Sequence, residues 1–447
     1  MGKLFGTAGV RDVYGVEIDE MLPLDFGRSV ARVFSSADVV VSWDGRLSSP
    51  SLSSAVIAGV LAEGKNVRVL GLAPMPAACR ASMKEGSPGV YVTASHNPPE
   101  YNGLKALMED GSEATRGVEE KIEREITSLS RPKLPERPPA VLPSGYGVAD
   151  YLRDLVSSSA SVGDQKVVAD PGNGCASDIA PRVLSEIGLS VISVNDWVDG
   201  RFPMRPSEPT PENLRGLSEL ILRTEADYGI AWDGDADRVA LIDSRGRFVP
   251  QYAVSCLVAL ALRAKRAIIS VDMGWGLRDL LEREGGDVIV WRLGDLHSEY
   301  KRRLEAGWSA DLVTEPWKIM APTWGPYFDG IKAAALVAQA VHEFGSLEEA
   351  LEAVPKYYQE RMSFKVSGDR SVIFNRVTEA LEEELSSQVR EVDRLDGVKF
   401  ILEDGWVLIR VSGTEPKIRV YVEAKTDDRK RELASLAVKK LREAGVT

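Results

Sequence analysis

The chain has few of the features that mark membrane-spanning or disulfide-bonded proteins. Its 447 residues include three cysteines, which lie far apart and lack the close spacing of a zinc site: Cys79, Cys175 and Cys256. No apolar run reaches the roughly 20 residues that a membrane-spanning helix needs. The N-terminal stretch MGKLFGTAGVRD lacks the apolar region of a signal peptide. We therefore expect reduced cysteines in the core and a cytoplasmic location.

An excess of positive charge is also missing. The formal net charge of −12 argues against nucleic acid or a membrane surface as a partner, although it leaves room for a local basic pocket that binds a phosphorylated small molecule. With 44% hydrophobic and 27% charged residues, the composition is that of an ordinary globular protein. The length predicts about three or four domains. Both a monomer and a homo-oligomer are compatible with the sequence.

One pattern occurs three times along the chain. A β-branched run, a glycine-containing turn, a helix-length segment and a second apolar run follow one another in residues 39–71, 166–195 and 267–294. This alternation is typical of βαβ units with parallel strands. From about residue 360, a helical segment, three adjoining strands and a closing helix indicate a small α+β domain with a partly antiparallel sheet.

These patterns predict an α/β fold with three tandem, similar α/β domains and a C-terminal α+β domain. Residues 130–145 are too rich in proline for a helix or a central strand and are interpreted as the first linker. The predicted domain boundaries are 1–140, 141–248, 249–355 and 356–447.

The stretch AWDGDADRVALID carries Asp233, Asp235 and Asp237 at alternate positions. In an extended segment alternate side chains point the same way, so three carboxylates converge on one side, and a bound cation would offset their repulsion. An EF-hand would need Gly in place of Arg238 and Glu in place of Ser244. We therefore expect Mg²⁺, completed by a phosphoryl oxygen. A solvated acidic turn is the alternative.

The stretch VTASHNPPEYNGLK places Ser95 in a loop that two prolines, Pro98 and Pro99, expose and fix. A phosphoserine on Mg²⁺ is a competent phosphoryl donor, because the metal neutralises charge on the transferring group. We predict that Ser95 carries the phosphoryl group and contributes to the metal site, with Lys105 as a nearby cation. A capped turn is the alternative for this stretch taken alone.

Two further loops offer groups that bind phosphate. RVSGTEPKIRVY places Arg410, Ser412, Gly413 and Thr414 in a turn between two strands, with Arg419 in the second strand. Hydroxyls, backbone amides and a guanidinium in such a turn form an anion-binding nest. LFGTAGVRD is a second glycine-rich turn, which ends near Arg11. A tight structural turn is the alternative for each loop.

Together these motifs closely resemble the α-D-phosphohexomutase family of phosphoglucomutases and phosphomannomutases. The resemblance covers nearly the whole chain in the same order and rests on TASHNP, DGDADR and SGTEPKIR, with FGTAGVR, DGRFP and EPTPENL in agreement. It implies four domains around one cleft, a phosphoserine at Ser95 and Mg²⁺ on the three aspartates. It also implies that a hexose 1-phosphate becomes a hexose 6-phosphate through a hexose 1,6-bisphosphate.

The resemblance also implies roles for individual residues. Arg11, His96 and Lys105 belong to the catalytic centre with Ser95, and Arg238 binds substrate there. Gly294, Asp295 and Glu315 lie near the sugar. The distal phosphate of the substrate is bound by Arg410, Ser412, Gly413, Thr414 and Arg419.

The chain departs from the family pattern at the sugar loop. Where many members have GExSGH, this chain has TEPWKI, which keeps Glu315 but places Trp317, Lys318 and Ile319 where Ser, Gly and His are common. Without that histidine, we expect Lys105 to transfer the proton, and we expect the Trp317 ring to lie against the sugar. Glucose and mannose phosphates are the expected substrates.

Three alternatives remain: a phosphoglucosamine mutase of the same family, an Mg²⁺-dependent phosphatase, and a non-catalytic sugar-phosphate sensor. A phosphatase would not need the separate distal phosphate loop, and a sensor would be expected to lose Ser95 or a ligand aspartate.

Overall fold

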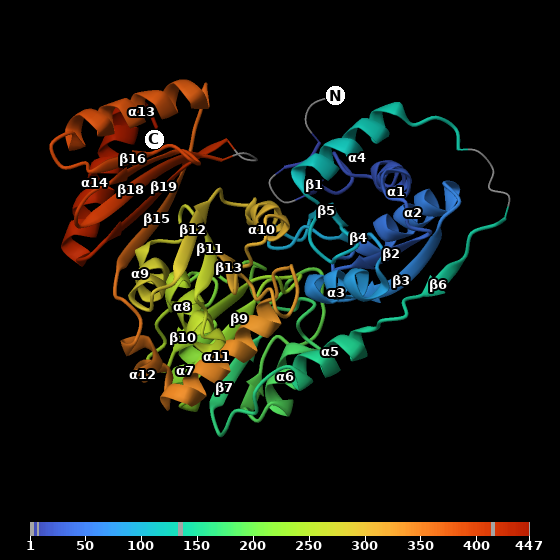
Figure 1. Cartoon of the computed structure of the whole chain (residues 1–447), viewed down its shortest axis with the longest axis horizontal. Helices are drawn as coiled ribbons and strands as arrows, with labels where there is room; N and C mark the ends of the chain where they lie inside the picture. The colour runs from blue at the N-terminus through green and yellow to red at the C-terminus, as the bar shows by residue number, and fades with distance from the viewer. Residues whose placement is uncertain (1–3, 7–8, 133–136, 413–415, 447) are drawn as a thin grey trace.

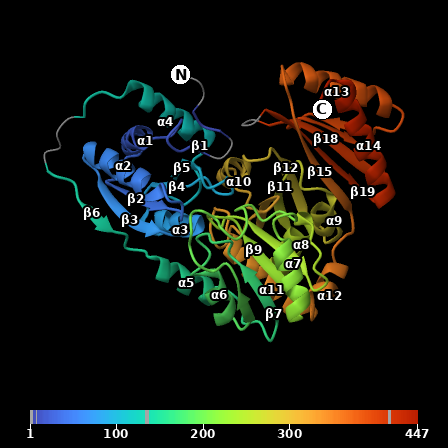
Figure 2. The same cartoon turned by 180° about the vertical axis from the view of Figure 1, so that it is seen from behind.

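The computed structural model describes residues 4–6, 9–132, 137–412 and 416–446. Four sheets follow one another along this part of the chain (Figure 1). The first three are mixed sheets with helices packed on them, and the fourth is antiparallel, so the predicted fold class is confirmed. The first and fourth sheets lie on opposite sides of the molecule (Figures 1 and 2). The predicted boundaries between domains stay a prediction.

The first sheet has the order β1-β5-β4-β2-β3-β6. Its strands are β1 Val10–Val13, β2 Asp38–Trp43, β3 Asn66–Leu72, β4 Gly89–Val92, β5 Tyr101–Leu107 and β6 Val141–Pro143. Its helices are α1 Met21–Val33, α2 Ser49–Ala62, α3 Met75–Glu85 and α4 Arg116–Ser128. The last strand, β6, lies within the proline-rich segment and is an edge strand, the position in a sheet that tolerates proline.

The second and third sheets have four strands each, in the orders β10-β9-β7-β8 and β12-β11-β13-β14. The second contains β7 Lys166–Asp170, β8 Ser190–Ser193, β9 Tyr228–Trp232 and β10 Val239–Asp243, with α5 Val148–Ser157, α6 Ala180–Glu186 and α7 Arg215–Thr224. The third contains β11 Arg266–Ser270, β12 Asp287–Trp291, β13 Leu312–Glu315 and β14 Lys318–Met320, with α8 Gln251–Leu262, α9 Trp275–Arg283, α10 Leu296–Glu305, α11 Gly330–Phe344 and α12 Leu347–Glu352.

The fourth sheet is antiparallel throughout, in the order β15-β19-β18-β17-β16. Its strands are β15 Tyr358–Lys365, β16 Glu391–Asp393, β17 Val398–Ile401, β18 Gly405–Val411 and β19 Lys417–Ala424, and its helices are α13 Arg370–Leu385 and α14 Asp427–Glu443. Both helices begin at a capping side chain, Asp369 or Thr426, which accepts from backbone amides of the first turn.

The first three sheets share one arrangement of strands. In each, a central strand (β2, β7 or β11) has a parallel neighbour on both sides, and an antiparallel strand follows the second neighbour. The three connections β4–β5, β9–β10 and β13–β14 are therefore equivalent in position. These connections carry Ser95, the three aspartates and the turn between Glu315 and Lys318, so the repeated unit supplies one functional segment from each sheet.

The units are joined through apolar packing and α10. The largest group of buried apolar side chains runs from α3 through the second and third sheets, while the fourth sheet has its own core. Helix α10 lies beside the first sheet in both views, and Lys301 on α10 pairs with Asp110 at 3.0 Å (Figures 1 and 2). Within the described part of the chain, no helix combines the length and apolar character needed to cross a membrane.

Candidate functional site

Ser95 is fully buried in the connection between β4 and β5. Its backbone is left-handed, with φ of 49°, which is uncommon for a residue that has a side chain. The Ser95 amide donates to Thr93 Oγ1 at 2.7 Å, and the Ser95 hydroxyl donates to Asp233 Oδ2 at 2.8 Å. The turn thus directs the hydroxyl at the acidic loop. Pro98 and Pro99 are exposed, as expected, but the serine itself is not.

The Ser95 loop is held by Arg46, a residue that the sequence analysis did not select. Arg46 is 1% exposed, and its guanidinium donates to the carbonyl oxygens of Ser95 at 2.8 Å, Asn97 at 2.6 Å and Tyr101 at 2.9 Å. Asp44 Oδ2 accepts from Arg46 Nε at 3.1 Å and balances its charge. The Asp-Gly-Arg turn directly after β2 is the sequence signal that could have revealed this clamp.

Asp233, Asp235 and Asp237 are all buried, and one oxygen of each lies within 4.8 Å of the others. Burial and the neighbouring carboxylates raise the pKa of Asp233 and Asp235 above the usual range. Burial acts in the same direction on Asp237, but the ammonium groups of Lys318 and Lys105 outweigh it and lower the pKa of Asp237. Carboxylates this close together in a buried site are costly unless a cation compensates them.

The oxygen atoms of the three aspartates fit a divalent cation. Asp233 uses both of its oxygens, because Oδ1 accepts from the Arg238 amide at 3.2 Å and Oδ2 accepts from Ser95. Among the described residues, Asp235 Oδ1 and Asp237 Oδ1 have no hydrogen-bond partner. Buried oxygens rarely stay unpartnered, and carboxylate oxygens are the ligands that Mg²⁺ prefers. Asp233, Asp235 and Asp237 would hold the cation next to Ser95.

Two lysines contact the acidic loop from different sheets. Lys105 on β5 lies with Nζ 3.3 Å from Glu113 and 3.4 Å from Asp237 Oδ2. Lys318 on β14 lies closer to the same aspartate oxygen, with Nζ at 2.9 Å. Burial would raise the pKa of Glu113, but Lys105 and Lys318 lower it to about 2, so Glu113 is a carboxylate at neutral pH. The sequence predicted Lys105 at this centre and gave Lys318 no role there.

Two arginines lie at the edge of the acidic loop. Arg238 pairs with Glu208 at 2.9 Å, and its Nε lies 3.7 Å from Asp233 Oδ2. Arg11 on β1 donates to Asn97 Oδ1 over a long 3.4 Å, and no hydrogen-bond partner of its Nε is found in the described residues. Burial lowers the pKa of Arg11, while the carboxylates nearby act in the opposite direction. Both guanidinium groups thus have an Nε without a hydrogen-bond partner among the described residues.

His96 is the titratable side chain next to Ser95 in the chain. Its Nδ1 lies 3.5 Å from the Ser95 hydroxyl oxygen, a weak contact. Burial, Arg238 and Arg11 lower the pKa of His96 well below its usual value. The imidazole is therefore neutral at neutral pH, and burial and the two guanidinium groups disfavour its protonation.

Family models match three separate parts of the chain. They are Phosphoglucomutase/phosphomannomutase, alpha/beta/alpha domain I at residues 2–133, domain II at 149–246 and the C-terminal domain at 348–440. A relative named Phosphopentomutase, from Thermococcus kodakarensis, is 36% identical and covers 97% of both chains. A relative named Probable phosphoglucosamine mutase, from Thermococcus gammatolerans, is 34% identical and covers 99% of both chains.

The chain belongs to the α-D-phosphohexomutase family. It is accordingly an isomerase of the intramolecular phosphotransferase type. The fold agrees, because a solved structure of a phosphoglucomutase/phosphomannomutase family protein from Burkholderia thailandensis superposes with a TM-score of 0.85. That structure is 24% identical and covers 100% of this chain and 98% of its own.

The predicted sugar loop lies in the hairpin between β13 and β14. Glu315, the residue shared with the family pattern, is 8% exposed and accepts from the Gly294 amide at 2.8 Å. Burial raises the pKa of Glu315, and Lys318 opposes that effect. Asp295 follows Gly294 at the start of α10 and accepts from the Trp291 indole at 3.1 Å. The structure thus brings Gly294 and Glu315 together and places Asp295 beside them.

Two substituted positions of the sugar loop are turned into the protein. The Trp317 ring lies 5.5 Å from the Phe248 ring and packs on the core of the second unit. Ile319 is 2% exposed and belongs to the main core. These contacts do not support the expectation that the Trp317 ring lies against the sugar. Lys318, between them, is the side chain of this turn that reaches the acidic loop.

The predicted phosphate loop belongs to the fourth sheet. Arg410 donates to Asp396 Oδ2 at 2.8 Å, and the same oxygen accepts from the Leu293 amide at 3.1 Å. This arrangement places Arg410 beside the loop that also contains Gly294. The Ser412 amide donates to the Lys417 carbonyl at 2.9 Å.

Of the other predicted phosphate ligands, the structure describes Ser412 and Arg419. Arg419 lies on β19 opposite Arg410 on β18. Gly413 and Thr414 lie outside the described residues. The fourth sheet lies on the opposite side of the molecule from β4 and β5 (Figure 1).

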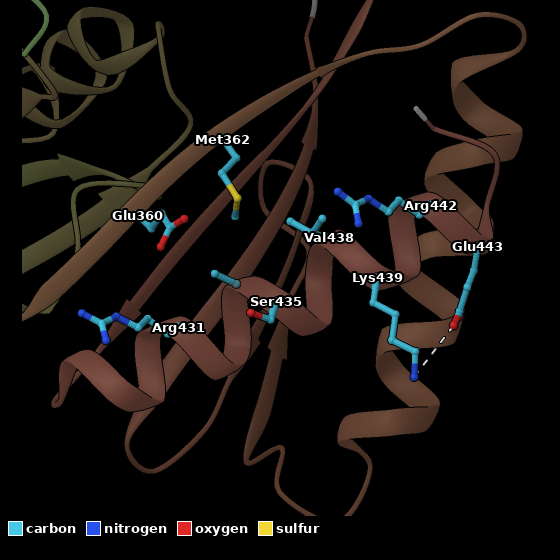
Figure 3. A pocket seen from close by; sticks show the side chains of 9 residues that line it. Glu360, Met362, Arg431, Ser435, Val438, Lys439, Arg442 and Glu443 are labelled. Carbon is cyan, nitrogen blue, oxygen red and sulfur yellow. Dashed lines mark ion pairs between the residues drawn. The ribbon is translucent and has the colours of Figure 1, made fainter. Parts of the chain in front are cut away.

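A separate groove lies on the outer side of the fourth sheet, between β15 and α14 (Figure 3). It is lined by Glu360, Met362, Arg431, Ala434, Ser435, Val438, Lys439, Arg442 and Glu443. None of these residues belongs to the predicted site.

Proposed function

We propose that this chain is a cytoplasmic, Mg²⁺-dependent mutase that interconverts hexose 1-phosphate and hexose 6-phosphate through a phosphoserine at Ser95 and a hexose 1,6-bisphosphate. Family membership supports a phosphosugar isomerase. The contact that carries the proposal is the 2.8 Å hydrogen bond from the Ser95 hydroxyl to Asp233, one of three buried aspartates. It supports a phosphoryl group on Ser95 next to the proposed cation.

The transfer step moves one phosphoryl group and one proton. A sugar hydroxyl oxygen forms a bond to phosphorus as the bond from phosphorus to Ser95 Oγ breaks. Lys105 donates a proton to the departing Ser95 oxygen and recovers one from the sugar hydroxyl, while Arg11 and Arg238 stabilise the negative charge. His96, 3.5 Å from Ser95 Oγ, is the second candidate for the proton transfer.

When bound, Mg²⁺ would neutralise charge on the transferring phosphoryl oxygens. The protein's own contribution is orientation and exclusion of water. Arg46 fixes the loop backbone through four carbonyl oxygens, those of Ser95, Asn97, Pro98 and Tyr101. Ser95 and Asp233 are at most 1% exposed. A site closed to water in this way favours transfer to a sugar hydroxyl over hydrolysis.

We assign the phosphate that is not reacting to the fourth sheet. Arg410, Ser412, Gly413, Thr414 and Arg419 form the proposed distal site. Glu315 and Gly294 would contact the sugar between the two ends. A separate distal site distinguishes a mutase from a simple phosphatase, because the bisphosphate must be held while it turns over.

The sugar itself is the least determined part of the proposal. Glucose and mannose phosphates are the first candidates, and glucosamine phosphate is an alternative, as the name of the Thermococcus gammatolerans relative suggests. A pentose phosphate is a second candidate because the Thermococcus kodakarensis relative is named Phosphopentomutase. Lys318 also favours a pentose phosphate. A lysine where the family pattern has glycine leaves less room for the sugar beside Glu315, and a pentose is smaller than a hexose.

A direct assay of the purified protein with Mg²⁺ tests the proposal. The 1-phosphates of glucose, mannose, glucosamine and a pentose are compared, each with a catalytic amount of its bisphosphate. The expected result is mutase activity with the hexose phosphates within about two orders of magnitude of one another in kcat/KM. Intact mass should show one added phosphoryl group, lost in Ser95→Ala. Absence of turnover with all four sugars would favour the sensor, and exclusive use of the pentose would replace the hexose assignment.

A further inference from the structure

Lys318 reaches the metal loop because the β13–β14 turn is docked on that loop. Trp317 occupies the turn with φ of 76°, a strained conformation for an aromatic residue. The Trp317 carbonyl accepts from the Val239 amide at 2.9 Å, and Lys318 forms an isolated antiparallel bridge with Arg238. The backbone of the sugar hairpin is thus bonded to the backbone of the acidic loop, and Lys318 is directed inward.

The Lys318 ammonium binds one oxygen of Asp237 and leaves the other unpartnered. Nζ lies 2.9 Å from Asp237 Oδ2, Lys318 is 5% exposed, and the Phe328 ring lies 5.3 Å from Nζ. Asp237 Oδ1 has no hydrogen-bond partner among the described residues. Lys318 therefore orients this carboxylate with one oxygen free for a cation, in the manner of groups that hold metal ligands from outside the coordination sphere.

A lysine differs from the usual supporting group of a metal ligand because it is positively charged. Its ammonium would lie a few ångströms from Mg²⁺ in a buried site, where repulsion between like charges is screened less than in water. Lys105 already lies 3.4 Å from the same oxygen, so Asp237 keeps one ammonium neighbour if Lys318 is replaced. Replacing Lys318 should therefore help Mg²⁺ binding more, by removing the repulsion between ammonium and cation, than it harms binding by leaving Asp237 less well oriented.

We propose that Lys318 is a positioning residue that tunes the metal centre: it fixes Asp237 through Oδ2, and its charge holds the affinity for Mg²⁺ below that of the three aspartates alone. The inference rests on the proposed metal site. It gives the sugar hairpin a second role, because the segment that carries Glu315 also sets the charge of the metal loop.

Calorimetric titration with Mg²⁺ alone, without sugar, tests this role. Lys318→Met removes both the charge and the donor, whereas Lys318→Gln removes the charge but keeps an N–H donor. We expect the Mg²⁺ Kd to fall about tenfold or more in both variants, because the repulsion between like charges is removed. The Mg²⁺-dependent rise in melting temperature should be larger in both variants than in the wild type, because tighter binding stabilises the folded state further.

Two controls make the result interpretable. Lys332→Met removes another buried lysine, whose Nζ donates to the Ser158 carbonyl at 2.7 Å, and should leave the Mg²⁺ Kd unchanged. Asp235→Asn should weaken binding, which shows that the titration reports on the three aspartates. Intact mass ensures that proteins with equal phosphorylation of Ser95 are compared.

A Mg²⁺ Kd that is unchanged or higher than that of the wild type in either Lys318 variant overturns the inference. Weaker binding in Lys318→Met alone would mean that orientation, not charge, is what Lys318 supplies. If the wild type itself binds no Mg²⁺, the proposed metal site fails and the inference fails with it. Tight binding in the wild type with no effect of Lys318 refutes only the inference.

Discussion

The hydroxyl of Ser95 and the carboxylate of Asp233 are 2.8 Å apart, although the residues are separated by 138 positions and belong to different sheets. The contact exists because equivalent connections of two repeated units face each other. It joins the proposed phosphoryl carrier to the proposed metal ligands.

Replacing Ser95 by alanine should abolish mutase turnover and leave the protein folded. The change removes one hydroxyl that donates to Asp233, so we expect a loss in unfolding free energy of only about 1 kcal/mol. Activity, melting temperature and intact mass are measured together. Ser29→Ala is a matched control, because Ser29 is also fully buried and its hydroxyl has no hydrogen-bond partner among the described residues. Near-full activity of Ser95→Ala would refute the phosphoserine assignment.

Arg46→Lys should reduce activity by at least tenfold and destabilise the protein. Lysine keeps the positive charge next to Asp44 but cannot present the flat set of donors that reaches Ser95, Asn97 and Tyr101. The substitution leaves buried carbonyl oxygens without a donor, so we expect the free energy of unfolding to fall by about 3 kcal/mol.

The control for Arg46 is another arginine of the first sheet. Arg68→Lys alters a pair with Asp38 in which the Arg68 side chain is 33% exposed, so stability should change by no more than about 0.5 kcal/mol. Urea unfolding and kcat measured on both variants check the contrast. Equal stability and activity of Arg46→Lys and Arg68→Lys would show that the clamp is dispensable.

Asp235→Asn should weaken Mg²⁺ binding and yet raise the stability of the metal-free protein. Burial and Asp237 raise the pKa of Asp235 in the folded state, so its ionised form destabilises folding at neutral pH. A neutral amide relieves that repulsion but is a poorer ligand for Mg²⁺. Melting temperature is measured with EDTA and with excess Mg²⁺. A metal-free variant that melts below the wild type, or an unaltered response to Mg²⁺, would contradict this account.

Local spacing was enough to predict one part of the site from the sequence. Asp233, Asp235 and Asp237 do lie close together, but they do so in a turn between β9 and β10 in which Ala236 has φ of 64°, and not in the extended segment that the alternation assumed. The β-branched runs likewise predicted the parallel strands. In the third unit the antiparallel strand at the end escaped the pattern, because β14 is only Lys318–Met320 and resembles a loop.

The roles of Arg46 and Lys318 could not be predicted, for a different physical reason. Each side chain acts on a loop that is distant in sequence, and each is an ordinary cation when its segment is considered alone. Their function depends on which buried acceptors the fold places within about 3 Å, and this depends on how the units pack. The position of the Trp317 ring could not be predicted for the same reason. The ring packs against Phe248, and we had expected it to lie against the sugar.

Arg410→Ala should weaken binding of the 1-phosphate and the 6-phosphate alike. One distal site must hold whichever phosphate is not reacting, so loss of a charge-assisted contact should cost roughly 1.5–3 kcal/mol with either substrate. KM is measured in both reaction directions. Arg429→Ala on α14, which removes a pair with Asp404 between β17 and β18, is the control and should leave both KM values unchanged. An effect in one direction only would contradict a shared site.

The free energy of unfolding should rise with pH above about 8 because of Lys399, which lies between the third and fourth sheets. Lys399 Nζ donates to the Val271 carbonyl at 2.7 Å and lies 3.9 Å from the Trp406 ring. Burial lowers the pKa of Lys399 to about 8, from an ordinary value of 10.5. Between these values the unfolded chain holds a proton that the folded protein has released, so the free energy of unfolding rises with pH in this window.

Lys399→Met tests this dependence because it removes the titrating group and keeps an apolar chain against Trp406. The wild type should gain on the order of 2–3 kcal/mol relative to the variant between pH 7.5 and pH 10.5. Urea unfolding of both proteins at matched pH values gives this difference, in which the other titrating groups cancel. Because the fourth sheet carries Arg410, KM for the sugar phosphate should depend less on pH in the variant. Parallel stability curves for the two proteins would show that Lys399 keeps an ordinary pKa in the folded state.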